Sequence, residues 1–229
     1  MEIYQYTNKG QRKENQDYTV YKVLPSGASI FIVADGMGGY SHGDIASHVV
    51  GDSIVSYVES NIDNLTPQTL LENAIKEANE TLQQKRLSLN VSKMGTVVSV
   101  ALIKGSEVYI TWLGDSRVYL FKGDYVVFKT EDHSLLNEIK TKRPLNASTI
   151  ERYAGVVTKC IMGNDDIGEI PVKEISISKG ETIVLCTDGF HKEMDINWAL
   201  KYNSTLKETL DAKSDNASDN YSFIKVALI

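Results

Sequence analysis

The chain has 229 residues, of which 42% are hydrophobic and 24% charged, and its formal net charge is −6 at pH 7. This composition is ordinary for a globular protein, and the length suits one sizeable domain or at most two small ones. The acidic balance argues against a nucleic-acid-binding protein, which needs a basic face to neutralise phosphates. It does not exclude a site that handles phosphate, because cations held by clustered acidic residues can invert the local field.

The sequence has no feature of a membrane span or a signal peptide. Its longest apolar runs, such as residues 97–103, are far too short to cross a bilayer. The N-terminus lacks a basic region followed by an apolar one. The two cysteines, Cys160 and Cys186, have no metal-like spacing, so we expect free thiols. We therefore expect a cytoplasmic protein and, because the sequence ends in a predicted strand, no appended membrane anchor or sensor domain.

The first part of the chain predicts three strands followed by two helices. The strands are predicted at residues 2–7, 18–23 and 28–35. Apolar residues then recur at helical spacing from Gly43 to Ile62. A second helix is predicted from about Pro67 to Leu87, with Thr66 as its N-cap.

The remainder of the chain predicts mainly strands. Four apolar stretches are separated by short turns that contain glycine, as in an antiparallel meander. These stretches are residues 95–103, 107–113, 116–121 and 125–130. Residues 132–168 are irregular and mixed in charge. Further strands are predicted at 170–177, 181–189 and 221–229, with a weak helix within 190–210.

The order of these elements indicates an α+β fold. The helices do not alternate with the strands, so they are expected to cover sheets rather than to connect parallel strands. At least nine predicted strands favour two stacked antiparallel sheets over one. The sequence contains no internal repeat and no linker, so we expect residues 1–229 to form a single domain.

Aspartates recur at the ends of the predicted strands. They are Asp17, Asp35, Asp115, Asp188 and Asp219. Each one alone is more often explained by a turn or a helix cap. Strand ends from distant parts of a chain can meet at one rim of a sheet, however, and carboxylates that converge there repel one another unless they are protonated or bind metal. The recurrence therefore indicates a metal site.

The chemistry of this ligand set favours a hard cation. Oxygen ligands without cysteine or histidine favour Mg²⁺ or Mn²⁺ over Zn²⁺. Gly36 has no Cβ, so a main-chain carbonyl beside Asp35 could also approach an ion. Two such ions about 4 Å apart would share a bridging water and lower its pKa, which suits the hydrolysis of a phosphate ester. Arg12 could grip the phosphate with two hydrogen bonds, although an arginine in a polar loop is more often simply solvated.

Seven short motifs along the chain can be compared with those of known families. They are R-x-x-N-Q-D (12–17), VADGMGG (33–39), MGTVVSVALI (94–103), GDSRVYL (114–120), DHS (132–134), CTDG (186–189) and SDNYSFIKVAL (218–228). This order resembles that of the metal-dependent Ser/Thr protein phosphatases, the PPM or type 2C family. The sequence is most similar to the bacterial form, because it has DGMGG rather than DGHGG. The resemblance spans essentially the whole chain.

The resemblance implies both a fold and a reaction. The expected fold is a four-layer αββα sandwich, with two antiparallel sheets flanked by helices and a variable flap at about 132–168. The expected reaction is the hydrolysis of phosphoserine and phosphothreonine in proteins, with a hydroxide that bridges two Mg²⁺ or Mn²⁺ ions.

The resemblance also implies a role for each carboxylate. Asp35 matches the ligand that bridges both ions, and the carbonyl of Gly36 matches a further ligand. Asp188 and Asp219 match the remaining carboxylates of the first ion. Asp115 matches the residue that helps to hold a third and weaker ion in bacterial relatives.

Two further assignments complete the implied site. Arg12 matches the phosphate-binding arginine, and Asp17 matches an acidic position that acts near the centre through water. Gln16 departs from the family pattern, which usually has Glu there. The triplet Ser-Asp-Asn occurs twice, so Asp215 competes with Asp219 for the same role.

The partners implied by the family are phosphorylated proteins and a cognate Ser/Thr kinase that acts in opposition. We expect no nucleic acid and no membrane as partners, and a monomer by default. The alternative hypothesis is a catalytically weak or inactive relative that binds phosphoproteins as a scaffold, which Gln16 and the irregular flap would favour. A nucleotide-binding loop at residues 35–39 is a weaker interpretation, because no Lys-Ser/Thr follows the glycines.

Overall fold

The computed structural model describes residues 1–37, 42–164 and 166–229, and these form two five-stranded antiparallel sheets. In spatial order, the first sheet contains β1 (Glu2–Asn8), β10 (Tyr221–Ala227), β9 (Glu181–Cys186), β6 (Arg117–Lys122) and β7 (Tyr125–Lys129). The second sheet contains β2 (Asp17–Val23), β3 (Ser29–Gly36), β4 (Thr96–Lys104), β5 (Glu107–Leu113) and β8 (Val172–Ser176). The predicted pair of antiparallel sheets is therefore confirmed.

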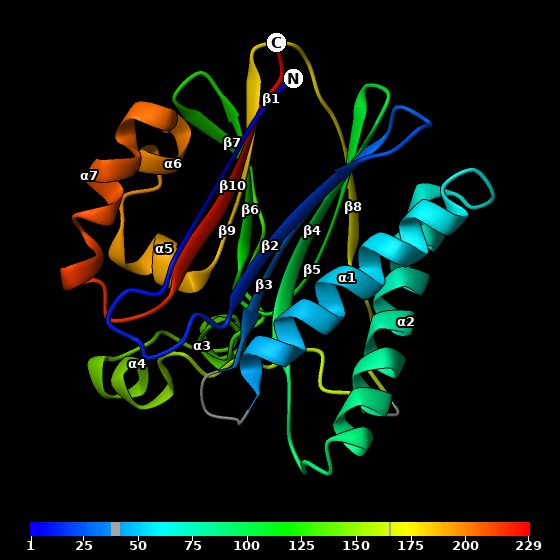
Figure 1. Ribbon diagram of the computed structural model, residues 1–229. Coiled ribbons are helices and arrows are strands. Elements are labelled where there is room, and N and C mark those ends of the chain that lie inside the picture. The colour runs from blue at the N-terminus through cyan, green and yellow to red at the C-terminus, as the bar shows by residue number, and fades with distance from the viewer. Residues whose placement is uncertain (38–41, 165) are drawn as a thin grey trace.

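Helices cover the outer face of each sheet, as Figure 1 shows. The second sheet is covered by the two long helices, α1 (Gly43–Asn61) and α2 (Pro67–Ser88). The first sheet is covered by short helices, which are α5 (Asp188–Glu193), α6 (Asn197–Lys201) and α7 (Lys207–Asp211), with 3₁₀ turns η1 (Ser204–Leu206) and η2 (Ser214–Asn216). Three short helices thus replace the single weak helix predicted within 190–210. The four-layer αββα sandwich is confirmed, and within the described part of the chain no helix is long and apolar enough to cross a membrane.

Three hydrophobic clusters fill the three interfaces between these four layers. In β3, Ile30 and Ile32 pack toward α1 and α2, whereas Phe31 and Val33 pack against the other sheet. Successive side chains of a strand point to opposite faces, so a strand buried on both faces needs an unbroken apolar run. The third cluster, which includes Phe223 of β10, lies beneath the short helices. This packing explains why β3 reads as a continuous hydrophobic segment.

The flap at residues 132–168 lies at the end of the molecule opposite the two chain termini (Figure 1). It contains two helices that were not predicted, α3 (Leu135–Lys140) and α4 (Ala147–Tyr153). The side-chain oxygens of Ser134 and Asn146 accept hydrogen bonds from the first turns of these helices. A helix of six or seven residues is too short to show a periodic pattern, so such caps and packing decide its formation.

Candidate active site

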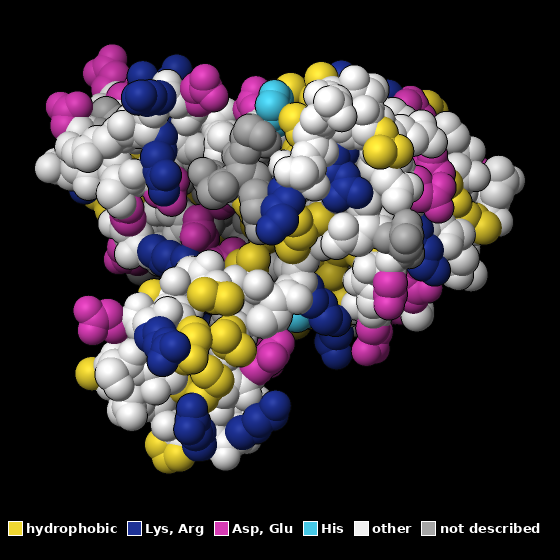
Figure 2. All heavy atoms as spheres, turned by 90° about the horizontal axis from the view of Figure 1, so that it is seen from below, with side chains coloured by type: hydrophobic (Ala, Val, Ile, Leu, Met, Phe, Trp, Pro, Cys, Tyr) yellow, Lys and Arg dark blue, Asp and Glu magenta, His cyan; other side chains and the backbone are white. Residues whose placement is uncertain are grey.

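A cavity of about 820 Å³ opens at the ends of both sheets, beside the flap. It is lined by six of the seven residues predicted for the site, which are Arg12, Asp35, Gly36, Asp115, Asp188 and Asp219. Residues 155–157 of the flap form part of its wall. Figure 2 looks onto this end of the molecule and shows Asp and Glu side chains gathered in a hollow of the surface. The structure therefore brings the predicted carboxylates together.

Strand pairing explains this convergence. Asp17, at the start of β2, lies directly opposite Asp35, near the end of β3. Asp188 follows β9 and Asp219 precedes β10, and these two strands are antiparallel neighbours. Asp115 lies in the short connection between β5 and β6. Like charges directly opposite one another destabilise a sheet, so the Asp17–Asp35 pair calls for a compensating cation or proton.

Asp17 does not line the cavity but is buried next to it. Its Oδ2 accepts a hydrogen bond of 3.0 Å from the hydroxyl of Thr187, which itself accepts one from the backbone N–H of Ser222. Its Oδ1 is buried without a hydrogen-bond partner among the described residues. Burial raises the pKa of Asp17 to about 7, and the nearby charges of Asp188 and Asp219 add to this effect. An unpartnered oxygen here fits a site that takes up a cation or its water.

The other carboxylates show the same excess of negative charge. The pKa of Asp35 is raised well above its usual range, first by burial and then by the charges of Asp17 and Asp188. The pKa of Asp115 is also raised, by burial and then by Asp188. The chemistry of this donor set therefore fits Mg²⁺ or Mn²⁺, which would relieve the repulsion.

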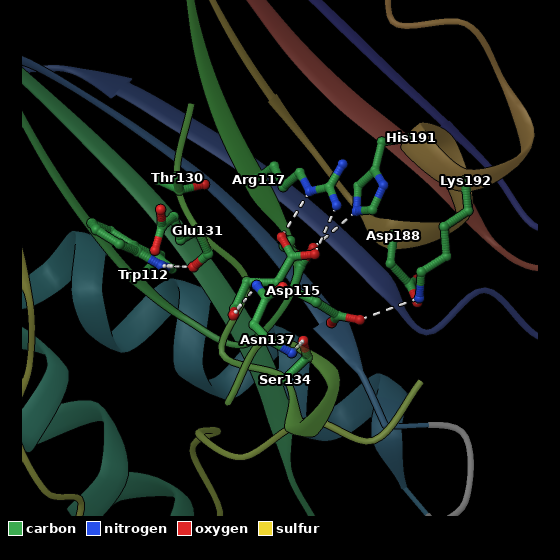
Figure 3. A network of polar contacts seen from close by, with 12 residues as sticks. Trp112, Asp115, Arg117, Thr130, Glu131, Ser134, Asn137, Asp188, His191 and Lys192 are labelled. Carbon is green, nitrogen blue, oxygen red and sulfur yellow. Dashed lines mark hydrogen bonds and ion pairs between the residues drawn. The ribbon is translucent and has the colours of Figure 1, made fainter. Parts of the chain in front are cut away.

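Two basic side chains balance part of this charge. The Nζ of Lys192 lies 2.6 Å from Oδ2 of Asp188 and 3.3 Å from Oδ2 of Asp115 (Figure 3). As a result the pKa of Asp188 is lowered even though burial acts to raise it. At the other side of the cavity a guanidinium nitrogen of Arg12 lies 2.9 Å from Oδ2 of Asp219. With these pairs in place, no three Asp, Glu, His or Cys side chains within the described residues are arranged as a ready metal-binding cluster.

The structure gives a different reason for Gly36 from the one expected. A Cβ on Gly36 would lie 2.2 Å from the carbonyl oxygen of Gly43, so the glycine is required where α1 begins against the end of β3. Gly189, after Asp188, is constrained in the same way, because its Cβ would lie 2.0 Å from the carbonyl oxygen of Asn220. Close backbone approach thus explains both glycines, and the carbonyl of Gly36 as a metal ligand stays a prediction. Gly38 and Gly39 of the same motif lie outside the described residues.

Asn220 is a site residue that the sequence analysis missed. Its side-chain amide donates to the backbone carbonyls of Lys9 and Glu14, at 2.8 and 3.0 Å, and its Oδ1 accepts from the backbone N–H of Gln16 at 2.8 Å. These bonds fix the loop that carries Arg12 to the start of β10. The sequence did contain an indication of this role, because Asn220 is the final residue of the second Ser-Asp-Asn motif. The sequence analysis assigned no hydrogen-bond partner to it.

Lys192 was missed as well, although it stands four residues after Asp188. That spacing places two side chains on the same face of a helix.

The positions of the two Ser-Asp-Asn triplets distinguish between Asp215 and Asp219 as the candidate site residue. Asp219 lines the cavity, whereas Asp215 is exposed in η2. This placement favours Asp219, and its role as a metal ligand remains a prediction.

Histidines support the site rather than line it within the described residues. His133 accepts a hydrogen bond of 3.3 Å at Nδ1 from the backbone N–H of Gly114. Burial, with the nearby charge of Lys159, lowers the pKa of His133 to about 4. Nε2 of His191 lies 2.9 Å from the backbone carbonyl of Asp115. Both histidines therefore hold the segment on which Asp115 lies.

Comparisons with known proteins agree with this fold. The family model described as protein phosphatase 2C matches residues 6–221. Protein phosphatase PhpP of Streptococcus pneumoniae is 30% identical over 194 residues, which cover 82% of this chain and 78% of PhpP. Serine/threonine phosphatase Stp1 of Staphylococcus aureus has a similar structure, with a TM-score of 0.82, 24% identity, and coverage of 100% of this chain and 95% of Stp1. The catalytic domain of the phosphatase PstP, solved with two manganese ions, gives a TM-score of 0.78 at 18% identity and covers 98% and 96% of the two chains.

The chain belongs to the protein phosphatase 2C family, whose model matches most of its length. It is an enzyme of the phosphoprotein phosphatase class and resembles the bacterial serine/threonine phosphatases.

Proposed function

We propose that this phosphatase removes phosphate from phosphoserine and phosphothreonine in proteins by using divalent cations held in the carboxylate-lined cavity. The observation that carries this proposal is the convergence of four aspartates from separate segments beside Arg12 in one cavity, with a fifth, Asp17, buried next to it. The two manganese ions in the PstP structure support the same choice of cofactor. Mn²⁺ and Mg²⁺ both suit an all-oxygen ligand set.

The residues that would hold the ions follow from the geometry and the resemblance. Asp35 and Gly36 line the cavity at the end of β3, together with Asp188, which follows β9, and Asp219, which precedes β10. Asp17, with its unpartnered oxygen beside Asp35, would act through water. Divalent cations held by these residues would supply the positive charge that lowers the pKa of a nucleophilic water and that neutralises charge on the phosphoryl oxygens.

Arg12 would bind the substrate phosphate. Its side chain is 51% exposed and pairs with a carboxylate that is 37% exposed, so the contact can be exchanged for a phosphate group at little cost. A guanidinium offers two parallel N–H donors to a phosphate, which orients the group as well as binding it. Asn220 holds the Arg12 loop in place for this purpose.

The flap would form the opposite side of the substrate site. Residues 155–157 line the cavity and carry apolar side chains at Val156 and Val157, which could pack against the peptide around the phosphorylated residue. We propose that residues 1–229 act together as one phosphatase domain, with the flap at about 132–168. The substrates of the phosphatase would be proteins that a cognate Ser/Thr kinase has phosphorylated. We also propose that the protein is a monomer.

The test is hydrolysis of para-nitrophenyl phosphate in Mn²⁺ or in EDTA by the wild type and Asp35→Asn. Activity should require the metal, and the substitution should lower kcat/KM by at least about 10²-fold because it removes a charge from the proposed ion-binding cavity. Asp124→Asn, in the exposed turn between β6 and β7, is the matched control and should keep wild-type activity.

Turnover that persists in EDTA, or an Asp35→Asn enzyme as active as the wild type, would contradict the proposal. Binding of a phosphopeptide without any hydrolysis would instead favour the scaffold alternative.

A further inference from the structure

Lys192 projects from α5 into the space between two carboxylates of the site. Its ammonium contacts Oδ2 of Asp188 at 2.6 Å and Oδ2 of Asp115 at 3.3 Å. Figure 3 shows the three side chains converging from α5 and from the connection between β5 and β6. The contact to Asp188 joins residues four positions apart on one helix, so the helix itself sets the direction of the lysine.

Asp115 has little freedom to leave this contact. Its side chain is only 9% exposed, and its backbone carbonyl is held by the ring of His191, the residue next to Lys192. The preceding residue, Gly114, donates a hydrogen bond from its backbone N–H to Nδ1 of His133. Its backbone carbonyl accepts a second hydrogen bond from the backbone N–H of His133. The carboxylate of Asp115 therefore faces the ammonium from a fixed position, and the same helix provides both the lysine and one of the clamps.

We propose that Lys192 is a built-in cation that fills the place where the sequence predicted a third, weaker metal ion at Asp115. The inference rests on the proposed two-ion function. The site would then contain two exchangeable metal ions and one ammonium group that is part of the chain. A divalent ion placed between Asp115 and Asp188, where the Oδ2 atoms of both residues face each other across Lys192, would need these oxygens at about 2.1 Å. The ammonium already occupies the space between those oxygens, so the two cations exclude each other.

The tether gives the lysine an advantage over a free ion. An intramolecular group competes at an effective concentration that can reach the millimolar range or more, whereas a weakly held ion must be supplied from solution. The ammonium also stays in place when the metal concentration falls. Lys192 contacts Oδ2 of Asp188, which leaves Oδ1 to serve one of the two proposed ions, so the two-ion centre and the lysine can coexist.

The test is the number of Mn²⁺ ions bound per chain, measured by titration with electron paramagnetic resonance of free Mn²⁺, and their positions in anomalous diffraction maps. The wild type should bind two ions, and Lys192→Met should gain a third, weaker ion between Asp115 and Asp188. Lys192→Arg keeps the charge and should stay at two, as should the matched control Lys207→Met on the exposed face of α7.

A third ion between Asp115 and Asp188 in the wild type, with Lys192 displaced, would overturn the inference. So would a folded Lys192→Met variant that still binds only two ions. If that variant does not fold, the ion count and the anomalous map of the wild type decide the question alone. A wild type that binds no Mn²⁺ in the cavity and hydrolyses no phosphate ester would overturn the proposed function itself, which separates the two failures.

Discussion

The two sides of the cavity balance their carboxylates in different ways. On one side, the Arg12 and Asp219 side chains are 51% and 37% exposed, and a single contact joins them. On the other side, Lys192 meets two carboxylates that are only 9% and 21% exposed, and the surrounding backbone is clamped by histidines. An exposed ion pair contributes about 0–1 kcal/mol and can open easily, whereas a nearly buried carboxylate must keep a partner. The comparison fits the proposed roles, in which Arg12 exchanges its partner for the substrate phosphate and Lys192 stays paired.

Of the two basic side chains, Arg12 should have the larger effect on activity. Arg12→Ala should lower kcat/KM for a phosphopeptide by roughly 10- to 100-fold, because it removes a charged, two-donor contact to the phosphate. Arg12→Lys should recover part of this loss, since it keeps the charge but not the planar fork. Steady-state kinetics would measure both variants, and unchanged kinetics in Arg12→Ala would contradict the exchangeable role.

The first prediction rests on a site that was largely foreseeable from the sequence. Asp35 follows the apolar run of β3, and the helical spacing of α1 begins at Gly43, so local patterns placed this carboxylate at a strand end. The same reasoning placed Asp115, Asp188 and Asp219. Strand ends are set by hydrophobic pattern and turn residues, which a single sequence contains.

Lys192 could not be foreseen in this way. Its direction depends on how α5 packs, and α5 is oriented by Phe190, whose ring lies 4.8 Å from that of Phe223 in β10. A helix of six residues has no periodicity that reveals its buried face. The flap helices α3 and α4 escaped prediction for the same reason. Contacts between distant segments, rather than local propensity, decide these elements.

Replacing Lys192 should reduce the stability of the fold more than replacing Arg12, although this effect is smaller than the effect on activity. In EDTA near neutral pH, Lys192→Met should lower the free energy of unfolding by about 1–2 kcal/mol, because it leaves Asp115 without its partner, and the partial exposure of the lysine limits the loss. Arg12→Met should change it by less than about 0.5 kcal/mol. Urea unfolding would measure both variants. A larger loss in Arg12→Met than in Lys192→Met would reverse the comparison.

The smallest expected effect is on the pH dependence of stability, and it comes from His133, which holds the backbone next to Asp115. Its pKa of about 4 in the folded protein lies below the ordinary value of 6.5, so as the pH falls below 6.5 the unfolded chain binds the proton first and stability is lost. From about pH 7 to 5.5, the wild type should lose about 1 kcal/mol more stability than His133→Gln.

The exposed His48→Gln substitution on α1 serves as the control for this pH effect. Its stability should follow the wild type across the same pH range. Equal pH dependence in His133→Gln and the wild type would show that the ring does not resist protonation, and the clamp on Gly114 would lose its support.

The most direct test of the central claim uses the two Ser-Asp-Asn triplets of one loop. Release of phosphate from a phosphothreonine peptide in Mn²⁺ should fall by at least about 10²-fold in Asp219→Asn, which changes a carboxylate that lines the cavity. Asp215→Asn, which changes an exposed residue four positions earlier, should stay within about twofold of the wild type. Full activity in Asp219→Asn, or an equal loss in both variants, would contradict the claim that the cavity carboxylates carry the reaction.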